Sequence, residues 1–233
     1  MPTHNNAEDH AGMKLRAAQR ALELVESGMT VGLGSGSTAT LWIQLLGEKV
    51  RDHGLQIRAV ATSEDSERLG RSYGIPFVTF EECQSLDLAI DGADEIAPGL
   101  DLIKGGGGKL LREKIVASAA KRFVVIADES KQVEKLGRFP LPVEVIPMAA
   151  PLVSDALREL GFTPKIRMNH EGARYITDEG NLILDCSGLL IEHPGSMAAK
   201  IKSIVGVVEH GLFVHMADLA LIANEQQVIE RPV

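Results

Sequence analysis

The sequence predicts an α/β fold, with a largely parallel sheet in one part of the chain and a smaller α+β unit in another. Short apolar strands alternate with helical segments through the first 130 residues, which is typical of a parallel sheet covered by helices. The segments at residues 86–90 and 123–127 are apolar and indicate buried strands. Hydrophobic residues make up 45% and charged residues 24% of the 233 residues, an ordinary globular composition.

The spacing of apolar residues predicts the elements of this first part in order. We expect strands over residues 30–31, 57–61, 86–90 and 123–127, and helices over residues 14–27, 38–50, 63–71 and 109–121. Gly28 is expected to end the first helix, and Ser63 to cap the third. In sheets of this kind ligands bind outside the carboxyl ends of the strands, so the loops that follow the strands are the expected site.

After residue 131 the pattern changes to that of a small α+β unit. The proline-rich segment 139–147 is expected to be an edge strand or a crossing between domains, because proline weakens a central strand. Gly161 should stop the first of two further helices, and residues 178–181 should form a turn. The expected helices span residues 149–160 and 195–204, and the expected strands span 165–168, 175–176 and 181–186.

The two apolar strands at 212–214 and 219–223 are expected to return to the first sheet. The predicted organisation is therefore a mobile polar tail over residues 1–12, an α/β domain over 13–136 and 211–233, and a smaller α+β domain over 137–210.

Charge and composition exclude several classes of function. The chain has 24 basic and 32 acidic residues, a net charge of −8, which argues against a dedicated nucleic-acid binder. The longest uncharged stretch, residues 27–47, is filled with Gly, Ser and Thr in its first half and does not resemble a membrane span. Two cysteines are too few for a disulfide scaffold, and the histidines show no metal-binding spacing. We therefore expect a soluble protein of a reducing compartment such as the cytoplasm, without a metal site built from histidines.

A first candidate motif, GLGSGST at residues 32–38, follows a strand and opens a helix. Glycines allow backbone N–H groups to converge on an anion, and a helix N-terminus favours negative charge. Ser35, Ser37 and Thr38 add hydroxyl donors around Gly36. The alternative is a tight turn with a serine cap, since the motif matches neither the dinucleotide fingerprint nor a Walker loop.

A second candidate motif, DGADE at residues 91–95, places three carboxylates directly after a buried strand. These groups suit a metal, sugar hydroxyls or acid–base work, and the alternative is an Asx turn with solvated acids. A third motif, KGGGGKLLREK at residues 104–114, runs four glycines into a helix. Lys104 before the glycines and Glu113 after them suit proton transfer beside an oxyanion, although each residue alone is more often a surface charge. Lys131 follows a strand end and could reach the same ligand.

Together these motifs resemble the type A family of ribose-5-phosphate isomerases. The matching segments, in chain order, are VGLGSGSTA, AIDGADEI, LIKGGGGKLLREK, ADESKQV and GRFPLPVEVIPMA. The resemblance runs from about residue 14 to residue 149 and returns over 211–223. It implies a Rossmann-like domain with a smaller ferredoxin-like domain, and a homodimer or homotetramer. It also implies metal-free interconversion of ribose 5-phosphate and ribulose 5-phosphate, a step of the non-oxidative pentose phosphate pathway.

The resemblance also assigns roles to residues. It implies that Glu113 is the general base, that Lys104 lies beside the reacting oxygens, and that Asp91 and Asp94 face the sugar hydroxyls, with Asp91 able to assist proton transfer. The remaining implied substrate contacts are Ser35, Gly36, Ser37, Thr38, Gly92, Ala93, Gly105, Gly106, Gly107, Lys131 and Lys14. Lys109 departs from the family pattern, which more often has a small residue after the glycines.

Two rival functions are compatible with parts of the sequence. A non-enzymatic sugar-phosphate sensor would normally carry a basic helix-turn-helix segment, which the first dozen residues and the net charge do not offer. An acyl or coenzyme A transferase would use a carboxylate, Glu113 or Glu95, as a covalent nucleophile.

Overall fold

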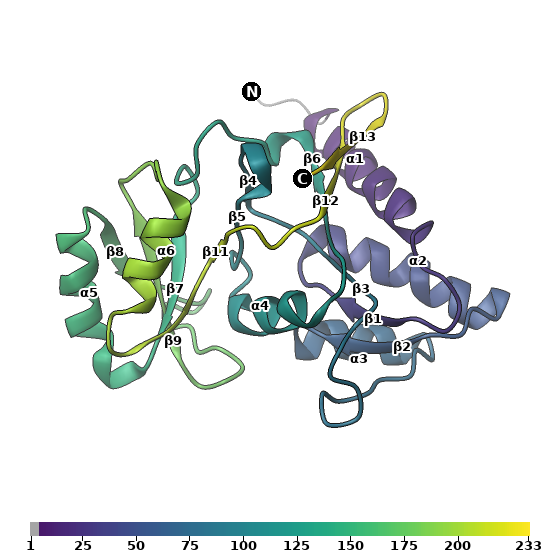
Figure 1. The fold of residues 1–233 in the computed structure, drawn as a ribbon, viewed down its shortest axis with the longest axis horizontal. Coiled ribbons are helices and arrows are strands. Elements are labelled where there is room, and N and C mark those ends of the chain that lie inside the picture. Colours follow the sequence, from purple (N-terminus) through teal and green to yellow (C-terminus); the bar gives the residue numbers. More distant parts are fainter. Residues whose placement is uncertain (1–4) are drawn as a thin grey trace. The chain divides into compact units, whose positions relative to one another are not determined.

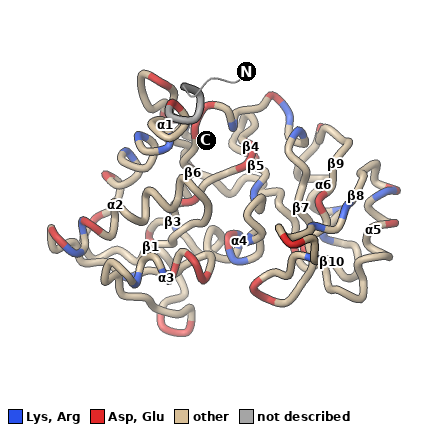
Figure 2. The backbone as a smooth tube through the Cα atoms, turned by 180° about the vertical axis from the view of Figure 1, so that it is seen from behind, with Lys and Arg blue, Asp and Glu red and all other residues tan. Residues whose placement is uncertain are grey.

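The computed structural model describes residues 5–233 of the chain. The chain forms two compact units, each of which is described here by itself. The first unit comprises the chain up to residue 93 together with residues 112–131 and 216–233. The second comprises residues 94–111 and 132–215. Basic and acidic residues are interspersed along both units (Figure 2).

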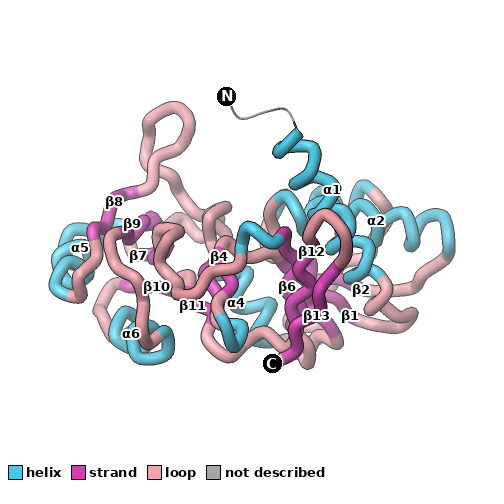
Figure 3. Tube along the Cα trace, turned by 90° about the horizontal axis from the view of Figure 1, so that it is seen from above, coloured by secondary structure: helices cyan, strands magenta, loops and turns pink. Residues whose placement is uncertain are grey.

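The first unit contains a six-stranded sheet of order β13-β12-β6-β3-β1-β2. The first five of these strands in the chain run parallel to their neighbours, and only β13 is antiparallel. Figure 3 shows β6, β12 and β13 side by side. The strands are β1 (Thr30–Leu33), β2 (Arg58–Ala61), β3 (Leu88–Asp91), β6 (Phe123–Asp128), β12 (Leu219–Ala223) and β13 (Val228–Pro232). The predicted parallel sheet is confirmed.

Helices cover both faces of this sheet. They are α1 (Asn5–Leu22), α2 (Ser37–His53), α3 (Glu64–Ser72) and α4 (Leu110–Ala119), the last of which starts in the second unit (Figure 1). Trp42 of α2 and residues of α1 form one core with Val31 and Leu33 of β1. Gly32 faces the opposite side, where a Cβ atom would lie 2.5 Å from Val116 of α4. The missing side chain lets α4 pack directly on β1.

The second unit contains a βαββαβ arrangement with sheet order β10-β7-β9-β8. All neighbouring strands are antiparallel, and this order is that of a ferredoxin-like fold, so the expected smaller domain is confirmed. The elements are β7 (Leu141–Val145), α5 (Ala150–Glu159), β8 (Thr163–Ile166), β9 (Leu182–Ser187), α6 (Pro194–Lys202) and β10 (Val207–His210). Both helices pack on this sheet through an aliphatic core that includes Val143, Val153, Leu184 and Ile201.

A three-stranded antiparallel sheet completes the second unit. It has the order β11-β5-β4 and is formed by β4 (Glu95–Ile96), β5 (Leu102–Ile103) and β11 (Leu212–Phe213). Within residues 5–233, three short 3-10 helices connect other elements: η1 (Pro98–Leu100), η2 (Glu129–Lys131) and η3 (Pro147–Ala149).

The first helix and the domain boundaries differ from the expectation. The tail expected over residues 1–12 is helical from Asn5 onward, and its residues 1–4 lie outside the described part of the chain. Helix α1 ends at Leu22, before Gly28. Residues 94–111, 132–136 and 211–215 group with the second unit. The strands β4, β5 and β11 of these segments pair with one another and not with the parallel sheet.

Three strand predictions in the second unit were wrong. The proline-rich segment forms β7 in the interior of its sheet, because only Pro142 lies within the strand and its carbonyl accepts the Gly211 N–H at 2.8 Å. Residues 175–176 form no strand. Strand β11 pairs with β5 and not with the first sheet, whereas β12 does return to that sheet.

Candidate active site

The carboxyl ends of three neighbouring parallel strands, β6, β3 and β1, carry most of the candidate residues of the first unit. The chain leaves β1 toward β2 on one side and returns to β3 on the other, so the strand order reverses between β1 and β3. Ligands of doubly wound sheets bind at such a switch point. Gly34 follows β1 and Asp91 ends β3, so both flank this position.

The loop after β1 packs tightly against the end of β3. The Gly34 N–H donates to the Ile90 carbonyl at 2.9 Å, and a Cβ atom on Gly34 would lie 2.3 Å from Asp91 Oδ1. Gly36 has a φ of 93°, which favours glycine, and precedes the first residue of α2, Ser37. Because glycine has no side chain to cap the 17-residue helix, the N–H groups of its first turn can receive an anion.

Two predicted lysines lie near this edge of the first sheet. Lys14 of α1 donates a hydrogen bond from Nζ to Ser37 Oγ at 3.1 Å, which brings a cation to the start of α2. Lys131 is partly buried in η2, directly after β6. Burial alone would raise the pKa of Asp128, but hydrogen bonds from Ser130 and the charges of His10 and Lys131 lower it overall.

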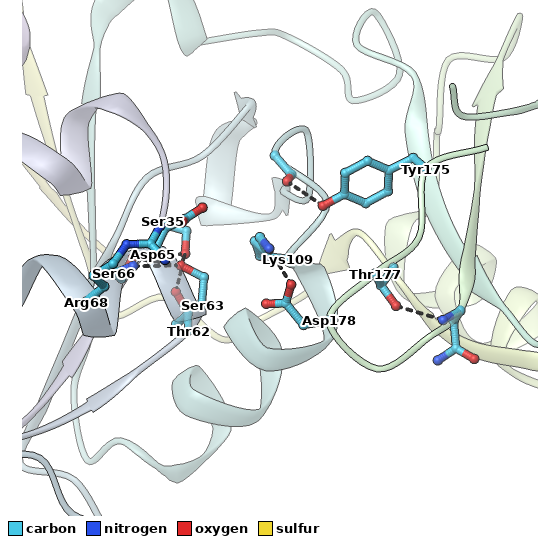
Figure 4. A network of polar contacts seen from close by, with 12 residues as sticks. Ser35, Thr62, Ser63, Asp65, Ser66, Arg68, Lys109, Tyr175, Thr177 and Asp178 are labelled. Atoms are coloured by element: carbon cyan, nitrogen blue, oxygen red, sulfur yellow. Dashed lines mark hydrogen bonds and ion pairs between the residues drawn. The ribbon is translucent and has the colours of Figure 1, made fainter. Parts of the chain in front are cut away.

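A buried cluster of hydroxyl groups supports the same loop. Ser35 Oγ lies 2.6 Å from Thr62 Oγ1 and donates to Ser63 Oγ at 2.9 Å (Figure 4). Ser63 caps α3 by accepting the Ser66 N–H at 3.1 Å, as expected from the sequence. Ser66 Oγ in turn donates to the Gly34 carbonyl at 2.7 Å. The sequence predicted that Ser63 caps α3, but it did not show that the hydroxyls of Thr62, Ser63 and Ser66 would reach the glycine loop.

Asp91 and Glu113 line one narrow crevice in the first unit, together with Gly34, Thr62 and Phe123. Both carboxylates are buried, with exposed fractions of 3% for Asp91 and 5% for Glu113. Asp91 Oδ1 accepts the N–H groups of Ser35 at 2.9 Å and of Gly92 at 2.7 Å, which fix the orientation of its carboxylate. Glu113 lies in the first turn of α4. Two predicted site residues that are 22 positions apart are thus brought together.

In the second unit, Lys104 is buried at the end of β5. Its side chain is 2% exposed, and Nζ lies 5.5 Å from the centre of the Phe213 ring. The Lys104 N–H donates to the Gly211 carbonyl at 2.9 Å. A lysine this deeply buried needs charged or polar partners, so Lys104 is not the solvated surface charge that was the alternative for this residue.

Asp94 holds the glycine run that follows Lys104. Asp94 Oδ2 accepts the Gly106 N–H at 2.7 Å, and a Cβ atom on Gly106 would lie 2.5 Å from Asp94 Oδ1. Ala93 and Asp94 are consecutive in the chain but fall in different units. The third carboxylate of this motif, Glu95, accepts the N–H groups of Gly137 at 2.7 Å and Phe139 at 2.6 Å. Glu95 is therefore occupied with backbone hydrogen bonds, which makes it a poor nucleophile.

Lys109, the departure from the family pattern, forms an ion pair within the second unit. Its Nζ lies 2.5 Å from Asp178 Oδ1, and the two side chains are 16% and 13% exposed (Figure 4). Residues 175–178 thus contact the glycine run, and the sequence offered no signal for this contact beyond the unusual lysine itself.

The described part of the chain offers neither a metal centre nor a membrane span. Within residues 5–233, no group of three or more His, Cys, Asp or Glu side chains is placed to hold a metal ion. No helix among these residues is both long and apolar enough to cross a bilayer.

The chain is similar to known proteins of one family over most of its length. The family model of ribose 5-phosphate isomerase A (phosphoriboisomerase A) matches residues 58–227. Ribose-5-phosphate isomerase A of Roseiflexus castenholzii is 53% identical over 225 residues, which cover 96% of both chains.

Two solved structures are similar over nearly the whole chain. Ribose 5-phosphate isomerase A from Methanocaldococcus jannaschii has a TM-score of 0.92 and 43% identity, covering 95% of this chain and 99% of its own. A D-ribose-5-phosphate isomerase in complex with phospho-erythronic acid has a TM-score of 0.93 and 36% identity, with coverages of 95% and 98%. The chain therefore belongs to the ribose 5-phosphate isomerase A family, and its activity is the interconversion of ribose 5-phosphate and ribulose 5-phosphate.

Proposed function

We propose that the chain carries out this isomerisation through a cis-enediolate, with Glu113 as the group that moves the proton between C2 and C1. The observation that carries the proposal is the burial of Glu113 and Asp91 in one crevice at the switch point of the parallel sheet. The complex of a similar enzyme with phospho-erythronic acid supports a phosphorylated sugar as the ligand.

The substrate's phosphate is proposed to bind at the start of α2. The N–H groups of the first turn and the hydroxyls of Ser35, Ser37 and Thr38 supply donors, and Lys14 adds a positive charge at Ser37. Lys131 is proposed as a further cation for the same anion. A chain of net charge −8 attracts a phosphate in this way through a few local donors.

The proton transfer requires one carboxylate that acts in both directions. Moving the carbonyl group from C1 to C2 removes the proton from C2 of the open-chain aldose, gives an enediolate, and returns a proton to C1. A single carboxylate on one face of the enediolate can do both, and Glu113 has the required burial. General-base assistance contributes about 10²–10⁴-fold, so the remaining rate enhancement comes from positioning the substrate and stabilising the enediolate.

We assign the remaining roles from the family resemblance. Lys104 stabilises the negative charge of the enediolate oxygens together with the loop of Gly105, Gly106 and Gly107, in which the Gly106 N–H already donates to Asp94. Asp91 is oriented by two backbone N–H groups and is proposed to accept a sugar hydroxyl and to assist ring opening. Gly92, Ala93 and Asp94 line the substrate. No metal or cofactor is needed for any of these steps.

The test is a direct assay of aldose-to-ketose conversion with the Glu113→Gln variant. The variant should bind substrate with nearly unchanged affinity and lose about 10²–10⁴-fold in kcat, because the amide cannot accept the proton. Glu64→Gln, an exposed first-turn glutamate of α3, is the matched control and should retain full activity. Turnover of the Glu113→Gln variant at the unaltered rate would disprove the assignment.

We further propose a homodimer or homotetramer in the cytoplasm, on the strength of the family resemblance. Light scattering of the purified chain would measure the mass of the assembly in solution. A mass of 25.1 kDa, that of one chain, would contradict the proposed oligomer.

A further inference from the structure

The glycine run 105–108 is held in one conformation by contacts on several sides, despite its composition. A Cβ atom would lie 2.7 Å from Leu110 Cβ at Gly105, 2.5 Å from Asp94 Oδ1 at Gly106 and 2.4 Å from the Tyr175 hydroxyl at Gly108. At Gly107 nothing would lie within 4 Å, and this residue is exposed. The run is therefore a fixed loop with one open position.

Arg167, which lies outside the sequence motifs, binds two carbonyl groups of this loop. Its Nη1 donates to the carbonyl oxygens of Gly105 and Gly106, each at 3.0 Å. Its other nitrogens form a two-pronged ion pair with Asp185 of β9, through Nε at 2.9 Å and through Nη2. The Arg167 side chain is 13% exposed, so its guanidinium is mostly buried and links strand β9 to the loop through hydrogen bonds on both sides.

Because the peptide bond is planar, fixing the two carbonyl groups also fixes the direction of the N–H groups on the opposite side of the loop. In a trans peptide the N–H points away from the C=O of the same peptide unit. The Gly105 carbonyl faces Arg167, and the N–H of the same unit, on Gly106, donates to Asp94 at 2.7 Å. The Gly106 carbonyl also faces Arg167, so the Gly107 N–H is turned away from the guanidinium, at the open position of the loop.

We propose that Arg167 is a positioning residue for the isomerisation, which aims the Gly107 N–H at an enediolate oxygen by fixing the Gly105 and Gly106 carbonyls. This inference rests on the proposed function, in which the glycine loop stabilises the enediolate. A donor held in place before the reaction stabilises the developing charge without reorganisation, so its loss acts on the transition state more than on substrate binding.

The test measures kcat, KM and the inhibition constants of two probes for the Arg167→Gln variant. Phospho-erythronic acid carries a carboxylate in place of the reacting carbons and a phosphate, whereas inorganic phosphate carries only the second group. We expect kcat to fall by about 10²-fold with little change in KM. Inhibition by phospho-erythronic acid should weaken, and inhibition by inorganic phosphate should be unchanged.

Arg174→Gln is the matched control, because Arg174 is an exposed arginine in the same segment of the second unit and should leave all four constants unaltered. Should Arg167→Gln fail to fold, Arg167→Lys keeps the charge but cannot serve Asp185 and both carbonyls together, and it should show the same selective loss to a smaller extent. Equal weakening of both inhibitors, or a kcat equal to that of the unaltered chain in a folded variant, would overturn the proposal. An inactive unaltered chain would instead refute the proposed function itself.

Discussion

At the scale of single residues, the candidate site depends on positions that lack a side chain as much as on those that carry charge. Gly34 has its N–H bound to the Ile90 carbonyl, and the space where its Cβ would lie is filled by Asp91. The Asp91 carboxylate in turn accepts the N–H of Ser35, the next residue of the same loop. The placement of one carboxylate is thus set by a glycine 57 positions earlier in the chain.

Gly34→Ala should therefore damage the site without removing any polar group from it. The added methyl group would lie 2.3 Å from Asp91 Oδ1, so either the loop or the carboxylate must move. A displacement of about 1 Å in a catalytic group costs about 10²-fold, which is the loss we expect in kcat/KM. Gly12→Ala, in helix α1 with no atom closer than 3.7 Å to the new methyl, should behave like the unaltered chain. Full activity of Gly34→Ala would show that the close packing has no functional consequence.

At the scale of elements, the amino end of α3 does two things at once. Ser63 caps the helix by accepting the Ser66 N–H, and its hydroxyl also receives the hydrogen bond of Ser35. Helix α3 lies outside the predicted substrate contacts, yet it supports the loop that supplies them. Its position after β2 makes this possible, since β2 is the parallel neighbour of β1.

Ser63→Ala should lower stability and loosen the phosphate loop together. Loss of the cap and of the hydroxyl contacts is expected to cost about 1–2 kcal/mol, which corresponds to about 2–8 °C in Tm for a chain of this size. Thermal unfolding would measure the first effect, and the inhibition constant of inorganic phosphate the second. The control is Ser72→Ala, an exposed serine at the other end of α3. Unchanged phosphate inhibition in a destabilised Ser63→Ala variant would restrict Ser63 to a structural role.

At the scale of the whole molecule, two units of different architecture are built from interleaved parts of one chain. The parallel unit holds Glu113 and Asp91, and the second unit holds Lys104 and Asp94. The chain crosses from one unit to the other between residues 93 and 94 and again between residues 111 and 112, both within segments that carry candidate site residues.

A prediction about the whole molecule concerns metal ions, because acidic side chains from any part of the chain could bind them. Prolonged treatment with EDTA followed by assay in metal-free buffer should leave kcat unchanged, since the proposed steps use only carboxylates, a lysine and backbone N–H groups. Loss of activity that returns on addition of Mg²⁺ or Mn²⁺ would place a metal at the acidic motif instead.

The parallel sheet and the candidate carboxylates were predictable because each has a local signal. Buried strands such as residues 123–127 are continuous apolar runs, and Ser63 stands directly before a helical pattern. Glu113 and Asp91 were found through their motifs, and the structure shows them lining one crevice.

The remaining features depend on contacts between distant residues. Arg167 is one of two arginines in the polar segment 165–180, and only the fold brings it to the carbonyls of Gly105 and Gly106. The interior position of β7 was hidden by the prolines of segment 139–147, because composition does not show that Gly211 meets the Pro142 carbonyl. The pairing of β4 with β5 involves two residues on each strand, too few for any periodicity.

The antiparallel strand β13 has a consequence for the behaviour of the chain at high concentration. A parallel sheet that ended at β12 would present an unbroken apolar edge, LALIA, which is the kind of segment onto which strands of other molecules add. Strand β13 covers that edge with Val228–Pro232, where Glu230, Arg231 and Pro232 are exposed. Charges and proline discourage further strand addition, so the last residues of the chain protect the sheet against aggregation.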